Sequence, residues 1–340
     1  MSLKQHSTKH QALSTKKRIK LRFWFLLSAC CLALNTYGCA SIAMKPFSGP
    51  EPLPDKLKVY YDYPAHEHQA VSTLLERGRS FDVYLVRFPL SAPAQLRATE
   101  PVVEFEWFQS HQETRRPAIL FNPILGGDYP IERNFCRTLA RQGFHVALVH
   151  RKTLKIAPEE PVSHLEVLLH QGILRIRQIT DWMADSDQVD ASRMASFGIS
   201  MGGIASVMTA AVEPRLRTHV VALAGGPIAD ILAGSHDKLL VKPRSVYLAR
   251  NHMDIQTLAA QMRESIKTDP ILLAPYVDSR TMLMYIAVLD RTIGTAHALK
   301  LWRALNRPQA VFMPAGHYTA YLALPYLKHS SIRFLRQRLR

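Results

Sequence analysis

The chain has 340 residues, of which 47% are hydrophobic and 21% are charged. This composition excludes a disordered or fibrous protein and predicts one large globular domain or two smaller ones. The net charge is +16, but residues 1–38 hold seven lysines and arginines and no acid, so residues 39–340 carry a net charge of +9. There the basic residues are scattered among acidic ones, without interleaved aromatic clusters. That pattern indicates a solvated surface or attraction to anionic lipids, and we expect no nucleic-acid partner.

The N-terminus has the layout of a signal peptide. The basic stretch "KKRIKLR" (16–22) precedes the apolar run "FWFLLSACCLAL" (23–34), which is too short for a comfortable membrane span. We predict that the protein is exported from a bacterial cytoplasm and loses residues 1–38. An anchor helix that is never removed is the alternative.

The next segment, "NTYGCAS" (35–41), resembles the bacterial lipobox, in which a small residue precedes a cysteine that becomes lipidated. The resemblance implies that Cys39 carries a lipid anchor and that the protein faces the periplasm or the cell exterior. This chain has Thr36 where the motif usually has leucine, and cleavage after Ala43 is the alternative. Either route leaves Cys136 without a cysteine to pair with. Residues 39–80, with the proline-containing "PFSGPEPLP" (46–54), are predicted to be a linker and lead-in.

From residue 81 onward, short β-branched and aromatic runs alternate with helical patterns, which predicts a mostly parallel sheet flanked by helices. The first two runs have little helix between them and predict an antiparallel opening pair. The predicted strands up to the middle of the chain are "FDVYLVRF" (81–88), "VVEFEWF" (102–108), "PAILFN" (117–122), "FHVALVH" (144–150), "RMASFGIS" (193–200) and "THVVALAGG" (218–226).

Residues 227–280 interrupt this alternation, because the segment is longer than a connection between two neighbouring parallel strands requires. It also includes the helical pattern "IQTLAAQMRESI". We expect a lid or cap insertion there. After it, "TMLMYIAVLD" ends on Asp290 and "QAVFMPAGH" ends on His317, as "RMASFGIS" ends on Ser200. Ligands of open α/β sheets gather at the carboxyl edge of the strands, so three chemically able residues at three strand ends predict an active site.

The stretch "FGISMGGIAS" (197–206) explains how a serine could become reactive. A sharp strand-to-helix turn presents the hydroxyl to a base, and Gly198 and Gly202 remove side chains that would collide in that turn. The following helix directs its free N–H groups at the serine, so the Met201 amide is a candidate oxyanion donor. An ordinary glycine turn is the alternative.

From about residue 81 to 330, the chain resembles the α/β-hydrolase superfamily, with Ser, acid and His in that chain order. The stretch "QVDASRMASFGISMGG" (188–203) is similar to one shared by the dienelactone-hydrolase-like and prolyl-oligopeptidase-like branches. The resemblance implies an α/β-hydrolase domain at 81–340 with Ser200 as nucleophile, Asp290 as acid and His317 as general base. Asp278 is the rival acid.

The second oxyanion donor should come from the loop after "AILFN", where the usual His-Gly pair is replaced by Asn122-Pro123. Proline has no N–H, so Pro123 cannot donate. The alignment of that loop implies Ile124 as the donor, with Leu125 in reserve.

These features together predict a serine hydrolase that cleaves a small-molecule carboxylic ester or other acyl substrate through an acyl-enzyme. No metal-ligand spacing, phosphate loop or dinucleotide motif is present in the sequence, so no cofactor and no metal are expected. Two alternatives remain: a peptidase or acyl-aminoacyl hydrolase of the same fold, and a non-catalytic envelope lipoprotein on a hydrolase scaffold.

Overall fold

A computed structural model describes residues 47–340 except 65–68, 94–95, 97–100, 112–113, 127 and 152–155. The chain divides into two units, residues 1–42 and 43–340, and the described residues all belong to the second unit. The predicted signal peptide and Cys39 lie outside the described residues. No helix in the described part of the chain is both long and apolar enough to cross a membrane.

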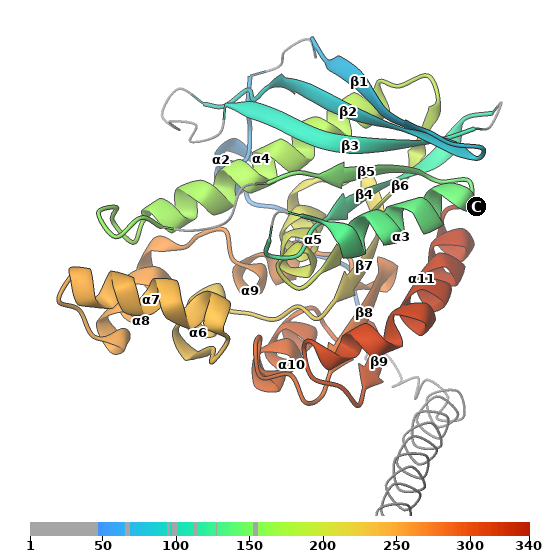
Figure 1. The fold of residues 1–340 in the computed structure, drawn as a ribbon. Coiled ribbons are helices and arrows are strands. Elements are labelled where there is room, and N and C mark those ends of the chain that lie inside the picture. Colours follow the sequence, from blue (N-terminus) through green and yellow to red (C-terminus); the bar gives the residue numbers. More distant parts are fainter. Residues whose placement is uncertain are drawn as a thin grey trace, which may run out of the picture. The chain divides into compact units, whose positions relative to one another are not determined.

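One nine-stranded sheet runs through the molecule in the order β1-β2-β3-β5-β4-β6-β7-β8-β9 (Figure 1). Strands β1, β2 and β3 pair antiparallel, as do β3 and β5, and all later pairs are parallel. The prediction of a mostly parallel sheet with an antiparallel opening is therefore confirmed. The strands are β1 Val71–Arg77, β2 Phe81–Pro89, β3 Val102–Ser110, β4 Arg116–Asn122, β5 His145–Val149, β6 Val189–Ile199, β7 Leu216–Ala222, β8 Met282–Ala287 and β9 Gln309–Met313.

Helices cover both faces of the sheet, which is why its central strands are buried along nearly their whole length. Apolar side chains of α3 and α11 pack on one face, and those of α4, α5 and α10 pack on the other. The helices are α2 Asp55–Tyr60, α3 Pro130–Arg141, α4 His164–Ala184, α5 Met201–Val212, α6 Ile228–Gly234, α7 Lys238–Arg250, α8 Ile255–Ser265, α9 Pro270–Leu273, α10 Thr295–Ala304 and α11 Leu324–Arg338, with short 3-10 turns η1 Ala274–Tyr276, η2 Ser279–Thr281 and η3 Thr319–Ala323.

The segment predicted as linker and lead-in contains regular structure. Helix α2 and strand β1 both lie before residue 81. Strand β1 is an edge strand whose residues are almost all exposed, so it lacks the apolar alternation by which a half-buried strand is predicted. Strand β1 belongs to the sheet because its backbone pairs with β2, and its side-chain pattern does not predict that pairing.

The predicted insertion is helical. Helices α6, α7, α8 and α9, followed by η1 and η2, fill the connection between β7 and β8. In Figure 1, α6, α7 and α8 lie together beside the sheet. Because β6, β7 and β8 are parallel neighbours, this insertion leaves the sheet at the same edge at which β6 ends.

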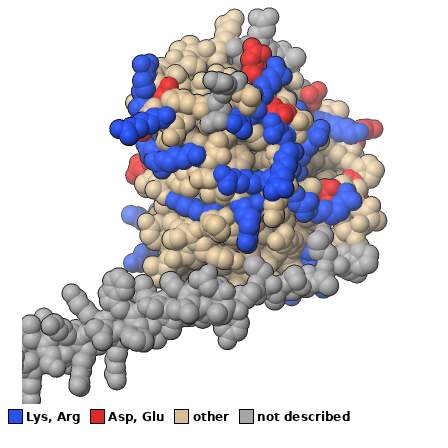
Figure 2. Space-filling model, turned by 90° about the vertical axis from the view of Figure 1, so that its right-hand side faces the viewer, with Lys and Arg blue, Asp and Glu red and all other residues tan. Residues whose placement is uncertain are grey.

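Basic side chains gather on one side of the molecule. Figure 2 shows the side that is on the right in Figure 1, where α3 and α11 lie, and Lys and Arg outnumber Asp and Glu there. Two basic residues of α11 contact α3 and its C-cap: Lys328 donates to Asn134, and Arg336 donates to Gln142 at 2.6 Å. We call this surface the basic face.

Candidate active site

Ser200 lies at the turn between β6 and α5 in a strained conformation, with φ 57° and ψ −121°. Its N–H donates to Ala222 O on β7 at 2.8 Å, which holds the turn against the neighbouring strand. A Cβ at Gly198 would lie 2.0 Å from Gly202 O, and a Cβ at Gly202 would lie 2.1 Å from Asn122 O. Only glycine fits at both positions, which explains the glycines on either side of the serine.

His317 and Asp290 meet Ser200 from two loops distant in sequence. His317 Nε2 lies 3.0 Å from Ser200 Oγ, and His317 Nδ1 lies 2.7 Å from Asp290 Oδ2. His317 follows β9, and Asp290 follows β8 three residues beyond its last residue, Ala287. The structure therefore brings the three predicted residues into one hydrogen-bonded chain, the arrangement of a nucleophile, a base and an orienting acid.

The Asp290 carboxylate is held by the backbone as well as by the imidazole. Its side chain is 3% exposed, and its Oδ1 accepts the N–H groups of Thr292 and Ile293 at 2.8 and 2.9 Å. These two amides fix the carboxylate so that Oδ2 faces His317 Nδ1. The rival acid Asp278 is instead paired with Arg280 at 2.7 Å and caps η2 through the Arg280 amide.

A second Ser–His pair lies inside the sheet. Ser196 Oγ is 2.9 Å from His219 Nδ1, between β6 and β7. Burial lowers the pKa of His219 to about 4, so the ring is neutral near pH 7. Ser196 is fully buried and lines neither of the apolar cavities on the Ser200 side, so this pair has the chemistry of a nucleophile and base without access to a substrate.

The oxyanion donors differ from the prediction at one of two positions. Met201 begins α5, and its N–H is one of the helix's unsatisfied N-terminal donors. The Ile124 N–H, however, donates to Oε1 of the fully buried Glu132 at 2.9 Å. Glu132 is in the first turn of α3 and reaches back to the preceding loop, as an acidic residue there commonly does.

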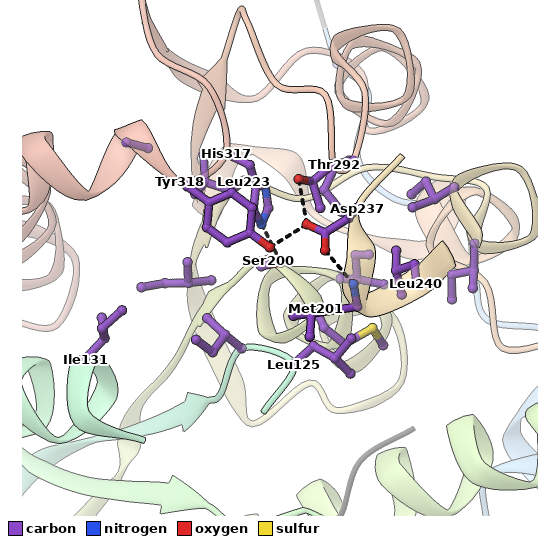
Figure 3. A pocket seen from close by; sticks show the side chains of 18 of the residues that line it. Leu125, Ile131, Ser200, Met201, Leu223, Asp237, Leu240, Thr292, His317 and Tyr318 are labelled. Atoms are coloured by element: carbon purple, nitrogen blue, oxygen red, sulfur yellow. Dashed lines mark hydrogen bonds between the residues drawn. The ribbon is translucent and has the colours of Figure 1, made fainter. Parts of the chain in front are cut away.

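In this conformation the Ile124 amide is not available to an oxyanion, which corrects the prediction for Ile124. Leu125, the reserve, lines the cavity beside Met201 (Figure 3). No hydrogen bond from the Leu125 N–H is found to any described residue. The Leu125 amide is therefore the remaining candidate for the second donor beside Met201.

Ser200 and His317 open into a cavity of about 390 Å³ (Figure 3). Its walls are mostly aliphatic side chains from the loop after β4, from α3, from α4 and from the insertion. Within the described residues, no group of three or more His, Cys, Asp or Glu side chains is placed to hold a metal ion.

Comparisons with known proteins agree with this fold. A family model described as the prolyl oligopeptidase family matches residues 176–337, which include Ser200, Asp290 and His317. An acetyl xylan esterase from a Paenibacillus species superposes with a TM-score of 0.64 at 17% identity, covering 84% of this chain and 93% of that one. An acetyl xylan esterase from a Thermoanaerobacterium species superposes with a TM-score of 0.61 at 14% identity, covering 83% and 96%. The chain has the α/β-hydrolase fold.

A third structure that is similar to this chain is the acylaminoacyl peptidase of Pyrococcus horikoshii. It superposes with a TM-score of 0.54 at 13% identity, covering 77% of this chain and 42% of that one. A search of curated protein sequences finds no match. Esterases and a peptidase are thus both among the structural neighbours, which supports a serine hydrolase of this fold.

Sequence analysis missed a contact between the insertion and the loop that carries His317. Asp237 Oδ2 accepts from Thr292 Oγ1 at 3.0 Å and from the Tyr318 hydroxyl (Figure 3), while Oδ1 accepts the Leu239 N–H at 2.9 Å. Burial opposes ionisation, but these hydrogen bonds, that from Tyr318 foremost, lower the pKa of Asp237 overall. Asp237 is recognisable in sequence only as the N-cap of α7; its link to the residue after His317 needs the tertiary structure.

Proposed function

We propose that this protein is a serine hydrolase that cleaves carboxylic esters through an acyl-enzyme. The observation that carries the proposal is the chain Ser200 Oγ, His317 Nε2, His317 Nδ1 and Asp290 Oδ2, with separations of 3.0 and 2.7 Å, at the wall of an apolar cavity. A serine hydroxyl needs an adjacent base to be a nucleophile at neutral pH, and His317 is placed as that base.

In the reaction, Ser200 Oγ attacks the ester carbonyl carbon while its proton passes to His317 Nε2. Asp290 accepts the Nδ1–H throughout, which sets the tautomer and stabilises the imidazolium. The carbonyl oxygen becomes an oxyanion that accepts hydrogen bonds from the Met201 and Leu125 amides. The intermediate then expels the alcohol, which takes the proton from Nε2, and water cleaves the acyl-enzyme by the same steps to release the acid.

Labelling with a fluorophosphonate probe tests the proposal, because the probe reacts only with an activated serine. Wild-type protein should be labelled and should cleave p-nitrophenyl esters, and Ser200→Ala should lose both. Ser196→Ala, which removes the sealed Ser–His pair, is the matched control and should keep labelling and turnover. Labelling that persists in Ser200→Ala would refute the assignment, and an unlabelled wild type would favour the non-catalytic scaffold.

Peptide or acyl-aminoacyl cleavage is the second candidate, favoured by the family-model match over residues 176–337 and by the neighbouring acylaminoacyl peptidase. Asp237 is the one carboxylate among the described residues that line the cavity, and its oxygens already accept three hydrogen bonds, which disfavours a free peptide amino terminus there. An N-acylated substrate carries no such charge and is separated from an ester by experiment alone. Activated esters are intrinsically more reactive than anilides, so the test uses non-activated substrates: cleavage of an ethyl ester without cleavage of an acyl-aminoacyl peptide by the same preparation would support the first candidate, and the reverse would support the second.

We further propose that the protein is exported and tethered to a membrane by a lipid on Cys39. The proposal is supported by the basic and apolar leader and by the lipobox-like "YGCAS". The basic face of α3 and α11 suits such a place, because anionic headgroups attract clustered Lys and Arg. Metabolic labelling with a palmitate analogue should be seen in the wild type and lost in Cys39→Ala. An unlabelled wild type would point to cleavage after Ala43, and labelling that survives in Cys39→Ala would refute Cys39 as the lipid site.

A further inference from the structure

The cavity beside Ser200 extends under the insertion and is lined by hydrocarbon. Leu125 and Ile131 form one wall, Leu165 and Leu169 of α4 form another, and Ile231 and Leu240 of the insertion close it. A smaller cavity of about 110 Å³ continues between the insertion and α4. The two share five lining leucines, namely Leu125, Leu165, Leu232, Leu239 and Leu240. The two cavities are therefore adjacent, and we call them together the apolar channel, which begins at Ser200.

Polar groups of the larger cavity lie mostly beside Ser200, and the smaller cavity adds Arg244 and Tyr247. Arg244 donates to the carbonyls of Leu232, Ala233 and Ser235, and the Tyr247 hydroxyl donates to Glu160 O. Of the residues that line the larger cavity, Ser200, Thr292 and His317 belong to the catalytic end. Asp237 is there too, and its carboxylate is satisfied by Tyr318, Thr292 and the Leu239 amide. Among the leucines and isoleucines of the larger cavity, a charged or hydrogen-bonding substrate group would lose water without gaining a partner, which is costly. The larger cavity therefore favours an unsubstituted hydrocarbon.

We propose that this channel binds the acyl chain of the substrate, and that the substrates are esters of medium-chain aliphatic acids. The inference rests on the proposed function, since Ser200 must attack the carbonyl at the channel's end. A cavity of roughly 150 Å³ suffices for benzene, so 390 Å³ has room for a chain of roughly eight to twelve carbons. An acetyl group would leave most of that apolar volume empty.

A series of p-nitrophenyl esters from acetate to dodecanoate tests the chain length. Each methylene that leaves water for the channel favours the transition state by up to about fourfold in kcat/KM. We expect the octanoate to exceed the acetate by about 100-fold or more, with a decline once the chain outgrows the channel. A wild type that labels at Ser200 yet prefers the acetate would overturn the acyl-channel inference and leave the hydrolase proposal standing. Absence of both labelling and turnover would instead refute the proposed function.

Two substitutions on α7 localise the effect. Leu240 is partly buried and lines both cavities, whereas Val246 on the same helix is 51% exposed and lines neither. Leu240→Trp fills the channel and should lower the ratio of kcat/KM for the octanoate to that for the acetate at least tenfold. Val246→Trp adds similar bulk outside and should change neither. Leu240→Ala enlarges the channel and should move the optimum to longer chains.

An equal loss for all chain lengths in Leu240→Trp, with an unchanged optimum in Leu240→Ala, would contradict the proposal. Circular dichroism and melting temperature show whether each variant is folded. If Leu240→Trp disturbs the lid, the chain-length optimum of Leu240→Ala still tests the proposal.

Discussion

The catalytic edge of the sheet and its antiparallel strands use buried charge in opposite ways. On β3, Glu106 accepts from Arg133 at 2.6 to 3.0 Å and from His150 at 3.1 Å, and His150 is bound in turn by Glu104 at 2.8 Å. Every member of that cluster has a charged partner. At the catalytic edge, Asp290 holds His317, but the chain of hydrogen bonds ends at Ser200 Oγ beside an open cavity.

This difference predicts which substitutions should lower stability and which should lower activity. A closed network of charges stabilises the fold, and breaking it leaves a buried charge without a partner. A series of hydrogen bonds that ends on a nucleophile instead transfers a proton, and breaking it lowers the catalytic rate while the fold is kept. Substitutions in the two regions should therefore separate activity from stability.

The largest expected effect is that of Asp290→Asn on turnover. The amide can still accept from the Thr292 and Ile293 N–H groups, but it presents N–H to His317 Nδ1 and so favours the wrong tautomer. We expect kcat for ester cleavage to fall by about 10⁴-fold with little change in melting temperature. Asp278→Asn, at the rival acid, should keep kcat within about twofold of wild type because Asp278 pairs with Arg280 and not with His317. The reverse pattern would reassign the acid.

A methyl group at Gly202 should disturb both properties, because it lies where the nucleophile turn meets β4. Its Cβ would be 2.1 Å from Asn122 O, and the backbone must shift to relieve the overlap. We expect Gly202→Ala to lower the free energy of unfolding by about 3 kcal/mol and to reduce activity strongly. Gly172→Ala in α4 is the control: nothing lies within 4 Å of its Cβ, and it should stabilise by about 0.5–1 kcal/mol. Urea denaturation measures both.

Glu106→Leu tests the closed network. Glu106 is 3% exposed, so its loss leaves His150 and Arg133 without their shared partner. Because the Arg133 side chain is a third exposed and can turn to solvent, we expect a loss of about 2–3 kcal/mol, below the range for fully buried pairs. Arg87→Gln, which breaks an exposed pair with Glu104, should cost less than about 1 kcal/mol. Turnover per folded molecule should stay unchanged in both, and a large loss of kcat in Glu106→Leu would link the two regions.

The same network should make stability depend on pH at both ends of the range. Burial would raise the pKa of Glu106, but hydrogen bonds from His150 and Arg133 outweigh it and lower the pKa to about 2. Its stabilisation is present above its unfolded pKa of about 4.3 and is lost as the pH falls toward 2. Burial opposes protonation of His150, but Glu106 and Glu104 raise its pKa overall. Its stabilisation is complete below its unfolded pKa of about 6.5 and is lost as the pH rises through the higher folded value.

The contribution of this network to stability, measured by melting temperature, should therefore be largest between about pH 4.5 and 6.5. Burial lowers the pKa of His145 and His219 to about 4, so these two residues instead add stability as the pH rises through that range. In His150→Gln the decline above that range should be smaller by about 1 kcal/mol or less, the smallest of the expected effects. An identical alkaline decline in this variant would show that another group causes it.

Local sequence determined the strands, most helices and the identity of the candidate nucleophile. The spacing of Gly198, Ser200 and Gly202 is a local requirement of a turn with φ 57°, so it is visible in five consecutive residues. Asp290 and His317 were predicted because parallel strands end at one edge, a rule that needs no coordinates. The edge strand β1 was missed because its side chains are exposed and carry no pattern.

Tertiary structure alone decided which backbone amide is free, what fills the space beside Ser200 and how the lid meets the catalytic loop. The engagement of Ile124 by Glu132 and the contact of Asp237 with Tyr318 each join residues whose types suit many other partners. The channel is likewise made of leucines and isoleucines that read as ordinary core residues in sequence. Aliphatic side chains have no directional chemistry, so only their arrangement around an unfilled volume distinguishes a binding site from a core.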